Sequence, residues 1–310
     1  MLLKEQNFGV EIELTGITRE RAAGIIAQHF GTSKMYLGSG YQTWGATDTK
    51  GRTWKAMRDA SINPQRKVDG RKISASDNYK CEVVTPILQY ADMEDLQEII
   101  RKLAKAGAFA NGSCGIHVHV DASRQTVDSL QRLMNFAVGR QDLFYEALQV
   151  TSERSERWCK KMDKRMLNAL KKDSTRTKSS VERIWYSRLN DGYNGCIDHG
   201  HYNSTRYHGI NFHAFFTKGT VEYRLFNGTT HAGKIKAYVQ FCLAMSAWAV
   251  EGKGGTNLFF KSVANYTQEQ KAELMLRILK NRLGMKGKEF RTARLHLTSA
   301  FTGQSIEEVA

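Results

Sequence analysis

Six short segments of the chain alternate apolar with polar residues, which is the pattern of a strand with one buried face. They are Phe8–Leu14, Thr53–Met57, Lys80–Leu88, Gly115–Asp121, Tyr207–His213 and Thr220–Phe226. Because alternation of this kind suits a sheet with one solvated face, we expect these strands to pair antiparallel.

Helical periodicity marks a second set of segments between and after the strands. They are Arg19–Phe30, Met93–Ala106, Val127–Val150, a basic stretch within 155–187, Lys234–Val250 and Gln268–Lys280. Residues 31–80 and 189–205 are rich in Gly, Asp, Ser and Thr, and we expect ordered loops over a site there. The mixture predicts an α+β fold.

The chain has no fixed-period repeat and no linker of low complexity, and its only prolines are Pro64 and Pro86. The sequence therefore predicts one main domain over residues 1–250, with a basic helical insertion near 150–205. A helical extension is expected over residues 251–310.

The polar faces of the predicted strands carry acids and histidines. In FGVEIEL, the side chains of Glu11 and Glu13 share one face and lie about 7 Å apart. If the strands belong to one sheet, its polar face gathers Glu11, Glu13, Glu82, His117, His119, Glu222 and Arg224.

This polar face is suited to metal and phosphate chemistry. Carboxylates held close together repel one another unless cations neutralise them, so a divalent metal is expected. Oxygen ligands favour Mg²⁺, and an imidazole among them would let Mn²⁺ compete. The planar guanidinium of Arg224 suits a phosphate. Carboxylates, metal and arginine together point to phosphoryl transfer.

A zinc site is the competing interpretation. The pairs His117-x-His119 and His199-x-His201 offer nitrogen ligands for a hydrolytic centre. This interpretation would leave Glu11, Glu13 and Glu222 without a role. No P-loop, no GxGxxG between a strand and a helix, no nucleophile elbow and no kinase signature occurs.

The charge balance changes the picture of possible partners. The chain has 46 Lys and Arg against 31 Asp and Glu, a net charge of +15. Residues 154–188 are its most basic segment, with Trp158, Trp185 and Tyr186 interleaved. This composition is typical of a surface for nucleic acid or another polyanion, and equally of a solvated helical face.

Composition also bears on location. No apolar run reaches the roughly 20 residues that a membrane-spanning helix needs, and the N-terminal residues lack the pattern of a signal peptide. The five cysteines are odd in number and form no CxxC pair. We therefore expect a cytoplasmic protein.

Five motifs resemble those of a known family. They are FGVEIEL at 8–14, WKAMRDASI at 54–62, CEVVTPIL at 81–88, NGSCGIHVHVDAS at 111–123 and TVEYRLFNGT at 220–229. Their order is similar to that in amidoligases of the carboxylate–amine ligase superfamily, which includes glutamine synthetase and glutamate–cysteine ligase. The resemblance covers roughly residues 7–250.

The resemblance implies an antiparallel sheet curved into a half-barrel, as in the glutamine synthetase catalytic domain, with helices on its convex face and ATP and magnesium ions on its concave face. It implies that a carboxylate takes the γ-phosphoryl group of ATP to form an acyl phosphate. An amine then attacks this intermediate to give an amide, ADP and phosphate.

The resemblance also implies roles for individual residues. Glu11, Glu13, Glu82, His117 and Glu222 look like metal ligands, with Glu82 also counted among the catalytic groups. His119 looks like a contact to the ATP phosphates, Arg224 like the group that stabilises the transferring phosphoryl, and Arg206 like a second phosphate- or substrate-binding arginine. The implied substrate-binding residues are Asp59, Ser61, Trp54 and Asn211, with Ala60 where the family more often has glycine.

The expected function is therefore an ATP-dependent ligase that forms an amide bond. The basic segment 154–188 favours a large acidic partner, such as a modified nucleic acid, an acidic peptide or a cell-wall precursor. Two alternatives stay open: a metal-dependent amide hydrolase, and a polyanion-binding protein with a degenerate ligase core.

Overall fold

The computed structural model describes residues 2–190, 192, 195–252 and 262–303. Parts of the predicted insertion near 150–205 and of the predicted extension over 251–310 lie outside the described residues. The chain divides into two compact units. We call the unit of residues 7–118 and 226–239 the strand unit, and the unit of residues 1–6, 119–225 and 240–310 the helical unit.

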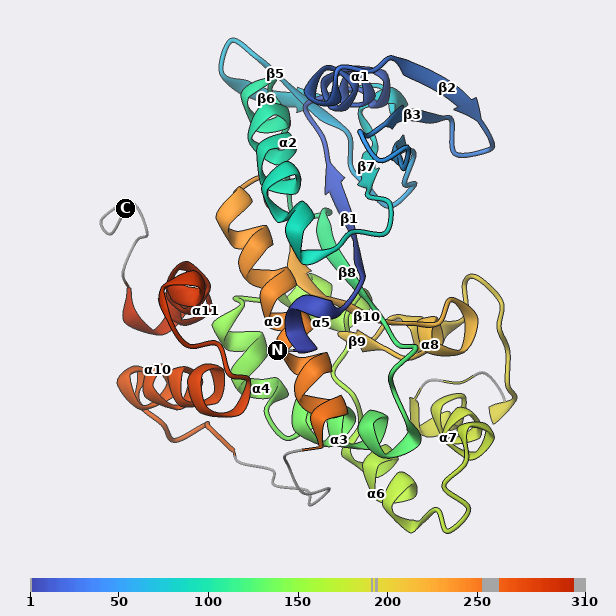
Figure 1. The fold of residues 1–310 in the computed structure, drawn as a ribbon, viewed down its shortest axis with the longest axis vertical. Coiled ribbons are helices and arrows are strands. Elements are labelled where there is room, and N and C mark those ends of the chain that lie inside the picture. Colours follow the sequence, from blue (N-terminus) through green and yellow to red (C-terminus); the bar gives the residue numbers. More distant parts are fainter. Residues whose placement is uncertain (1, 191, 193–194, 253–261, 304–310) are drawn as a thin grey trace. The chain divides into compact units, whose positions relative to one another are not determined.

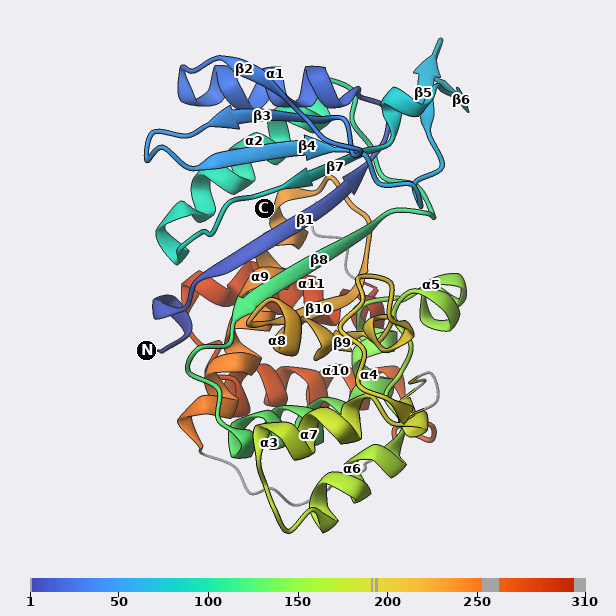
Figure 2. The ribbon, with the colours of Figure 1, turned by 90° about the vertical axis from the view of Figure 1, so that its right-hand side faces the viewer.

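The strand unit is built on an antiparallel sheet (Figure 1). Its strands are β1 (Phe8–Leu14), β2 (Lys34–Gly38), β3 (Thr43–Thr47), β4 (Thr53–Met57), β7 (Cys81–Val84) and β8 (Gly115–Asp121). They lie in the order β2-β3-β4-β7-β1-β8 (Figure 2). The division between the units falls within β8.

The strand order continues from β8 to β10 (Thr220–Asn227) and β9 (Ile210–Asn211). β9 pairs antiparallel with β10, and Glu222 lies opposite Asn211. Because β2 and β9 are the two edges of this order, the large antiparallel sheet is not closed into a barrel.

Two helices belong to the strand unit, α1 (Arg19–Phe30) and α2 (Met93–Lys105). The Thr18 side chain caps the N-terminus of α1, and Gly31 ends it with φ 68°. α1 packs on β2, β3, β4 and β7 and also contacts α2. Val10 and Ile12 of β1 are 1% exposed and belong to the core of this unit.

A separate β-hairpin follows β4. It consists of β5 (Gln65–Val68) and β6 (Arg71–Ser74), which form a sheet of two strands. Asp69 and Gly70 turn the chain, and both have positive φ (48° and 77°) as in a type I′ turn. Short 3₁₀ helices flank other elements of the chain: η1 (Leu2–Glu5), η2 (Asp77–Tyr79) and η3 (Tyr90–Asp92).

The helical unit holds most of the remaining helices. They are α3 (Val127–Val138), α4 (Gln141–Ala147), α5 (Ser152–Arg157), α6 (Lys164–Lys172), α7 (Lys178–Trp185), α8 (His213–Thr217), α10 (Gln268–Arg277) and α11 (Arg291–Thr302). Shorter turns are η4 (Arg188–Asn190), η6 (Ser204–Arg206), the π-helical η7 (Ile278–Arg282) and η8 (Lys288–Phe290). α9 (Ala232–Glu251) begins in the strand unit and ends in the helical unit. α10 and α11 pack side by side (Figure 1).

The α+β class is confirmed, and several predicted elements match closely. β1, β4, β8 and α1 have the predicted bounds. The helix predicted over Val127–Val150 is instead two helices, because α3 ends before Gly139, a weak helix former. The basic stretch 155–187 also divides, into α5, α6 and α7.

The prediction of a loop over residues 31–80 was wrong. This region contains β2, β3 and the β5–β6 hairpin in addition to β4. β2 is an edge strand with four exposed side chains at its start, so it lacks the alternation of buried and exposed residues that identifies a strand in the sequence. The glutamine synthetase-like half-barrel stays a prediction. Among the described residues, no helix is long and apolar enough to cross a membrane.

Candidate metal centre

Acidic side chains from neighbouring strands meet on one face of the strand unit. Glu13 of β1 lies opposite Glu82 of β7 in the antiparallel register. Glu11 stands two residues before Glu13 and therefore shares its face. Glu13 and Glu82 are only 4% and 9% exposed, so both carboxyl groups are withdrawn from bulk water.

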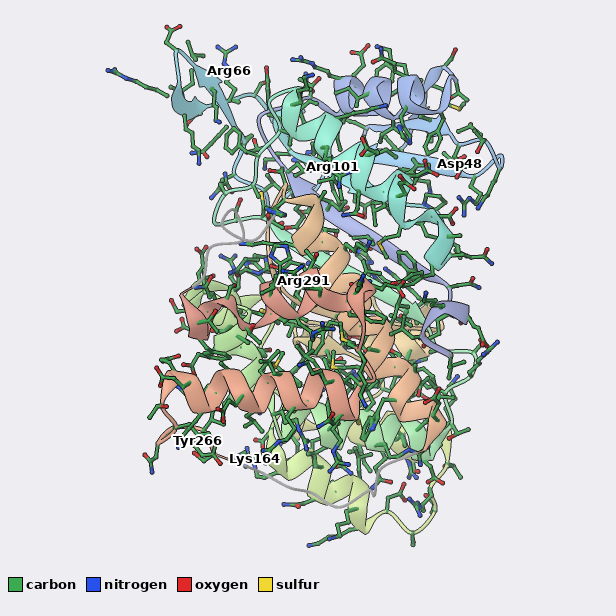
Figure 3. The ribbon with its side chains drawn as sticks, turned by 60° about the vertical axis from the view of Figure 1, so that its left-hand side comes forward. Asp48, Arg66, Arg101, Lys164, Tyr266 and Arg291 are labelled. Atoms are coloured by element: carbon green, nitrogen blue, oxygen red, sulfur yellow. The ribbon has the colours of Figure 1, made fainter. Side chains whose placement is uncertain are left out.

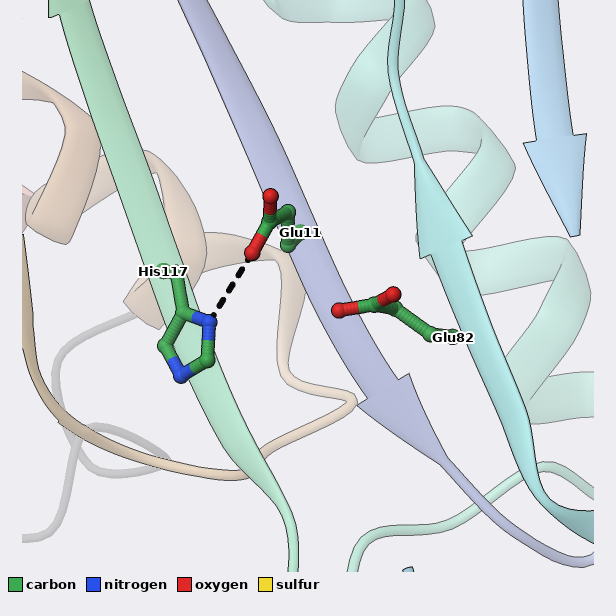
Figure 4. Close-up of side chains that lie close together, drawn as sticks. All are labelled: Glu11, Glu82 and His117. Carbon is green, nitrogen blue, oxygen red and sulfur yellow. Dashed lines mark hydrogen bonds and ion pairs between the residues drawn. The ribbon is translucent and has the colours of Figure 1, made fainter. Parts of the chain in front are cut away.

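His117 of β8 joins these acids. Its Nδ1 lies 3.0 Å from Oε2 of Glu11 (Figure 4), and its Nε2 lies 3.7 Å from Oε1 of Glu13. One ligand atom each from Glu11, Glu82 and His117 lie within 4.8 Å of one another. This first trio comes from three strands, and its geometry follows from the pairing of those strands.

A second trio shares Glu82 with the first. One oxygen each from Glu13, Asp59 and Glu82 lie within 4.8 Å of one another. Asp59 follows β4 in a turn in which its Oδ1 accepts hydrogen bonds from the backbone N–H and the hydroxyl of Ser61, both at 2.7 Å. The predicted substrate residues Asp59 and Ser61 thus lie at the edge of the acidic cluster, and the Asp59 carboxylate is oriented by the turn.

The donor set of the two trios fits a hard divalent cation. Buried carboxylates are costly unless a positive charge compensates them. Oxygen donors with a single imidazole are the ligands of Mg²⁺ or Mn²⁺ rather than of a thiolate-bound metal. We call Glu11, Glu13, Asp59, Glu82 and His117 the acidic cluster.

The helical unit carries a second group of predicted site residues. Nη1 of Arg224 donates to Oε1 of Glu222 at 2.5 Å, and Nδ2 of Asn211 donates to Oε2 of the same carboxylate at 2.7 Å. All three residues are 5% exposed or less. The Glu222 carboxylate is therefore fixed by a cation on one oxygen and an amide on the other.

His119 lies beside this group. Its Nδ1 is 3.1 Å from the hydroxyl of Thr220, and its Nε2 is 3.8 Å from Oε1 of Glu222. His119 also follows His117 by two positions on β8, so the two imidazoles point to the same face of that strand.

Arg206 and Arg224 both contact the aromatic ring of Tyr207. The guanidinium carbons of Arg206 and Arg224 are 5.6 Å and 5.9 Å from the centre of the Tyr207 ring. Nη1 of Arg206 also donates to the carbonyl of His201 at 2.5 Å. Tyr207, which sequence reasoning missed, thus contacts both guanidinium groups.

Trp54 lies apart from the acidic cluster. It is 1% exposed, and its ring packs on Phe30 of α1 with centroids 5.8 Å apart. The next residue of β4 on its face is Ala56, which pairs with Val83, whereas Met57 pairs with Glu82. Trp54 therefore faces α1 and is a core residue, and its predicted contact with substrate has no support in this placement.

The histidines of the zinc interpretation do not gather at one site. His199 is paired with Glu182, with Nε2 and Oε1 2.6 Å apart. Over residues 2–190, 192, 195–252 and 262–303, no cluster of metal-binding side chains includes His199 or His201.

A buried histidine that the sequence did not single out lies in the helical unit. Nδ1 of His213 is 2.7 Å from the hydroxyl of Tyr186. Burial, reinforced by the nearby charge of Arg206, lowers the pKa of His213 to about 4. His213 is thus neutral near pH 7, and its backbone N–H donates to the Asn211 side chain at 2.8 Å, which holds the partner of Glu222 in place.

The basic segment 154–188 exposes most of its cations, whereas Trp158 is half-buried and its other two named aromatic residues are fully buried. Trp185 and Tyr186 are 0% exposed and belong to the core, so they are not available to stack on bases. Arg154 is buried and donates to the carbonyl of Arg224 at 2.9 Å. Lys171, Lys172 and other cations of the segment are exposed.

Comparison with known protein families gives a match. A family model described as "Putative amidoligase enzyme" matches residues 4–246. The match includes β1, β7, β8 and β10, which carry the glutamates and histidines of both groups. No curated protein matches the chain.

Proposed function

The chain belongs to the amidoligase family, whose members are described as ligase-type enzymes, and from this premise we propose that it is an ATP-dependent carboxylate–amine ligase. It would join an acid and an amine into an amide through an acyl phosphate and release ADP and phosphate. The observation that carries the proposal is the acidic cluster, in which Glu82 belongs to two trios of ligand atoms.

In the proposed reaction, the acidic cluster holds the metal ions. Glu11, Glu82 and His117 would bind one ion. Glu13, Asp59 and Glu82 would bind a second, so that Glu82 is a ligand of both. The metal ions supply positive charge that neutralises the phosphate oxygens of ATP. The protein contributes orientation, because each ligand is fixed on a strand or in the Asp59 turn.

The group around Glu222 would act on the phosphates. Arg224 carries the guanidinium that would stabilise charge on the transferring phosphoryl group, and its fixed hydrogen bond to Glu222 keeps its planar fork in one orientation. Arg206 contacts the same Tyr207 ring and would supply a second guanidinium. The imidazole of His119 would donate to a phosphate oxygen.

The test measures phosphate and ADP release from ATP with Mg²⁺ in the presence of pooled carboxylates and amines. Glu222→Gln keeps the shape of the side chain but removes the charge that orients Arg224, and we expect it to abolish substrate-stimulated release. Glu98→Gln, an exposed change on α2, is the matched control and should leave release unchanged. Mass spectrometry of the wild-type mixture then identifies the amide.

Binding of ATP is followed separately by calorimetry, which does not depend on finding the substrate. Wild type that binds ATP only with Mg²⁺ or Mn²⁺ supports the proposal. Amide hydrolysis without ATP would instead favour the metal-dependent hydrolase. Absence of ATP binding, together with tight binding of polyanions, would favour the binding protein with a degenerate ligase core.

A further inference from the structure

The β5–β6 hairpin of the strand unit is strongly basic and exposed. It carries Arg66, Lys67, Arg71 and Lys72 against the single acid Asp69. All four cations are exposed, and Figure 3 shows Arg66 on the hairpin. Within the part of the chain that the structure describes, none of the four forms an ion pair or a hydrogen bond through its side chain.

The cross-strand pairs place like charges together. Lys67 lies directly opposite Lys72 in the register, and the Nζ atoms of both lie over the ring of Phe109, at 5.5 Å and 4.8 Å from its centre. Like charges directly opposite each other destabilise a hairpin. A bound anion would relieve this repulsion, and this is the physical argument that the hairpin binds one.

The other face of the hairpin combines cations with apolar side chains. Arg66 lies opposite Ile73, and Val68 lies opposite Arg71. Val68 and Ile73 are both 41% exposed. This face therefore offers both charge and apolar contact to a partner.

The base of the hairpin is attached to the strands of the acidic cluster. Gln65 exchanges hydrogen bonds with Thr15, from its N–H to the hydroxyl (2.7 Å) and from the hydroxyl to its carbonyl (2.8 Å). Asn63 accepts from the Asn111 side chain at 2.9 Å and donates its N–H to Ser113 at 2.9 Å. Thr15 directly follows β1, and Ser113 precedes β8.

The hairpin is therefore held at the ends of the two strands that carry Glu13 and His117. Asp59 is also close along the chain, because the six residues from Asp59 to Gln65 span at most about 20 Å. A chain bound along the hairpin would lie within the strand unit that contains the acidic cluster.

From these observations we propose that the β5–β6 hairpin is the docking arm for an acidic polypeptide substrate. The four cations would recognise its carboxylates. Outside Gln65, the outer edges of β5 and β6 pair with no other strand among the described residues, so an extended peptide can add to them by main-chain hydrogen bonds. Val68 and Ile73 would contact its apolar side chains.

A polypeptide fits this surface better than a nucleic acid. Single-stranded nucleic acid is bound by exposed aromatic rings on which bases stack. The ring beneath Lys67 and Lys72, that of Phe109, is only 8% exposed. A polypeptide also brings the carboxylate that the proposed ligase would activate. In this last respect the inference rests on the proposed function.

The test is equilibrium binding, by fluorescence anisotropy, of a fluorescein-labelled oligo-glutamate peptide in the absence of ATP. The hairpin variant combines Arg66→Gln, Lys67→Gln, Arg71→Gln and Lys72→Gln. The control variant combines Lys171→Gln, Lys172→Gln, Arg183→Gln and Arg188→Gln, which removes the same number of exposed cations from the basic segment 154–188. We expect the hairpin variant to bind roughly tenfold more weakly than wild type and the control to bind nearly as well.

A third variant, Lys67→Arg with Lys72→Arg, keeps the charge and should keep the affinity, which separates loss of charge from loss of structure. Equal weakening in the hairpin and control variants would overturn the proposal, because it would show attraction to overall charge. So would absence of binding by wild type, or tighter hairpin-dependent binding of an oligodeoxythymidine strand, which would indicate nucleic acid. Since no ATP is present, these results are independent of the ligase test.

Discussion

Replacement of Glu82 by glutamine should change stability in opposite directions with and without metal. Glu82 belongs to both trios of the acidic cluster. Its carboxylate therefore lies close to that of Glu11 and to those of Glu13 and Asp59. Without a divalent cation, its charge repels its neighbours. With one, the same charge is part of the binding site.

The size of the effect follows from the distances. Two carboxylates whose oxygens lie within 4.8 Å of each other repel each other by at least ~3 kcal/mol at an effective dielectric constant of about 20. His117 and bound protons offset part of this repulsion. Since 1 kcal/mol shifts Tm by about 2–4 °C for a domain of this class, Glu82→Gln should raise Tm by several degrees in EDTA.

Bound metal should make wild type more stable than Glu82→Gln. At a free concentration one hundred times Kd, Mg²⁺ stabilises the protein that binds it by about 2.7 kcal/mol. Wild type should gain this stabilisation, and Glu82→Gln should lose most of it because one shared ligand is gone. Differential scanning calorimetry in EDTA and in a Mg²⁺ series measures both effects, with Glu94→Gln, an exposed change on α2, as the matched control.

The reasoning would be refuted by a Glu82→Gln protein that is less stable than wild type in EDTA and shows the same Mg²⁺-dependent shift in Tm. Such a result would mean that Glu82 is stabilised by hydrogen bonds within the protein and that the cluster does not bind the ion.

Three further predictions concern stability. Arg52 and Lys50 hold the pKa of the buried Asp92 carboxyl well below its usual range. The stability that the charged carboxylate contributes is therefore lost as the pH falls below about 4. Asp92→Asn should lower the free energy of unfolding, measured with urea at pH 7, by about 3 kcal/mol. The fold lowers the pKa of His213 from 6.5 to about 4, so this imidazole binds a proton more readily in the unfolded chain. The free energy of unfolding should therefore fall by about 3 kcal/mol between pH 7 and pH 4. His213→Gln should remove this part of the pH dependence. Gly16→Ala should lower Tm far more than Gly31→Ala, because both have positive φ but only a Cβ at Gly16 would collide with the backbone, at 2.3 Å; equal losses would contradict this argument.

The sequence predicted best those elements whose side chains alternate between core and solvent. β1 and β8 have one apolar face against the core and one polar face, and their bounds match the alternation. The strand predicted over Lys80–Leu88 ends earlier, at Val84, because Pro86 lacks a backbone N–H for the sheet. Of the strand predicted over Tyr207–His213, only Ile210–Asn211 forms a strand. His208 makes an isolated bridge with Lys160, and His213 begins α8.

The missed strands lack this alternation for physical reasons. The side chains of β5 and β6 are nearly all exposed, so no burial pattern marks them. The Asp69-Gly70 pair is a hairpin signal in itself, but the residues that flank it are basic and do not alternate with apolar ones. A turn dipeptide between two polar runs is therefore better evidence for a hairpin than the composition of the region suggests.

Some residues of the candidate site were predictable from the sequence, and others were not. The acidic cluster was predictable because Glu11, Glu13, Glu82 and His117 lie on strands whose polar faces the sequence shows. The roles of Tyr207 and His213 depend on loops and helix ends that meet only in the folded chain. Trp54 is a core residue of β4, and its predicted contact with substrate stays a prediction.

The strand unit separates its charges, with buried acids in the acidic cluster and exposed cations on the β5–β6 hairpin. Under the proposed function, this separation imposes an order on binding. A substrate carboxylate is attracted by the hairpin but repelled by the cluster as long as Glu13 and Glu82 lack a metal ion. Binding of metal changes the sign of that interaction, so Mg²⁺ must bind before the carboxylate can approach. Docking on the hairpin should therefore be independent of Mg²⁺, whereas amide formation should require it, and the two requirements distinguish recognition from chemistry.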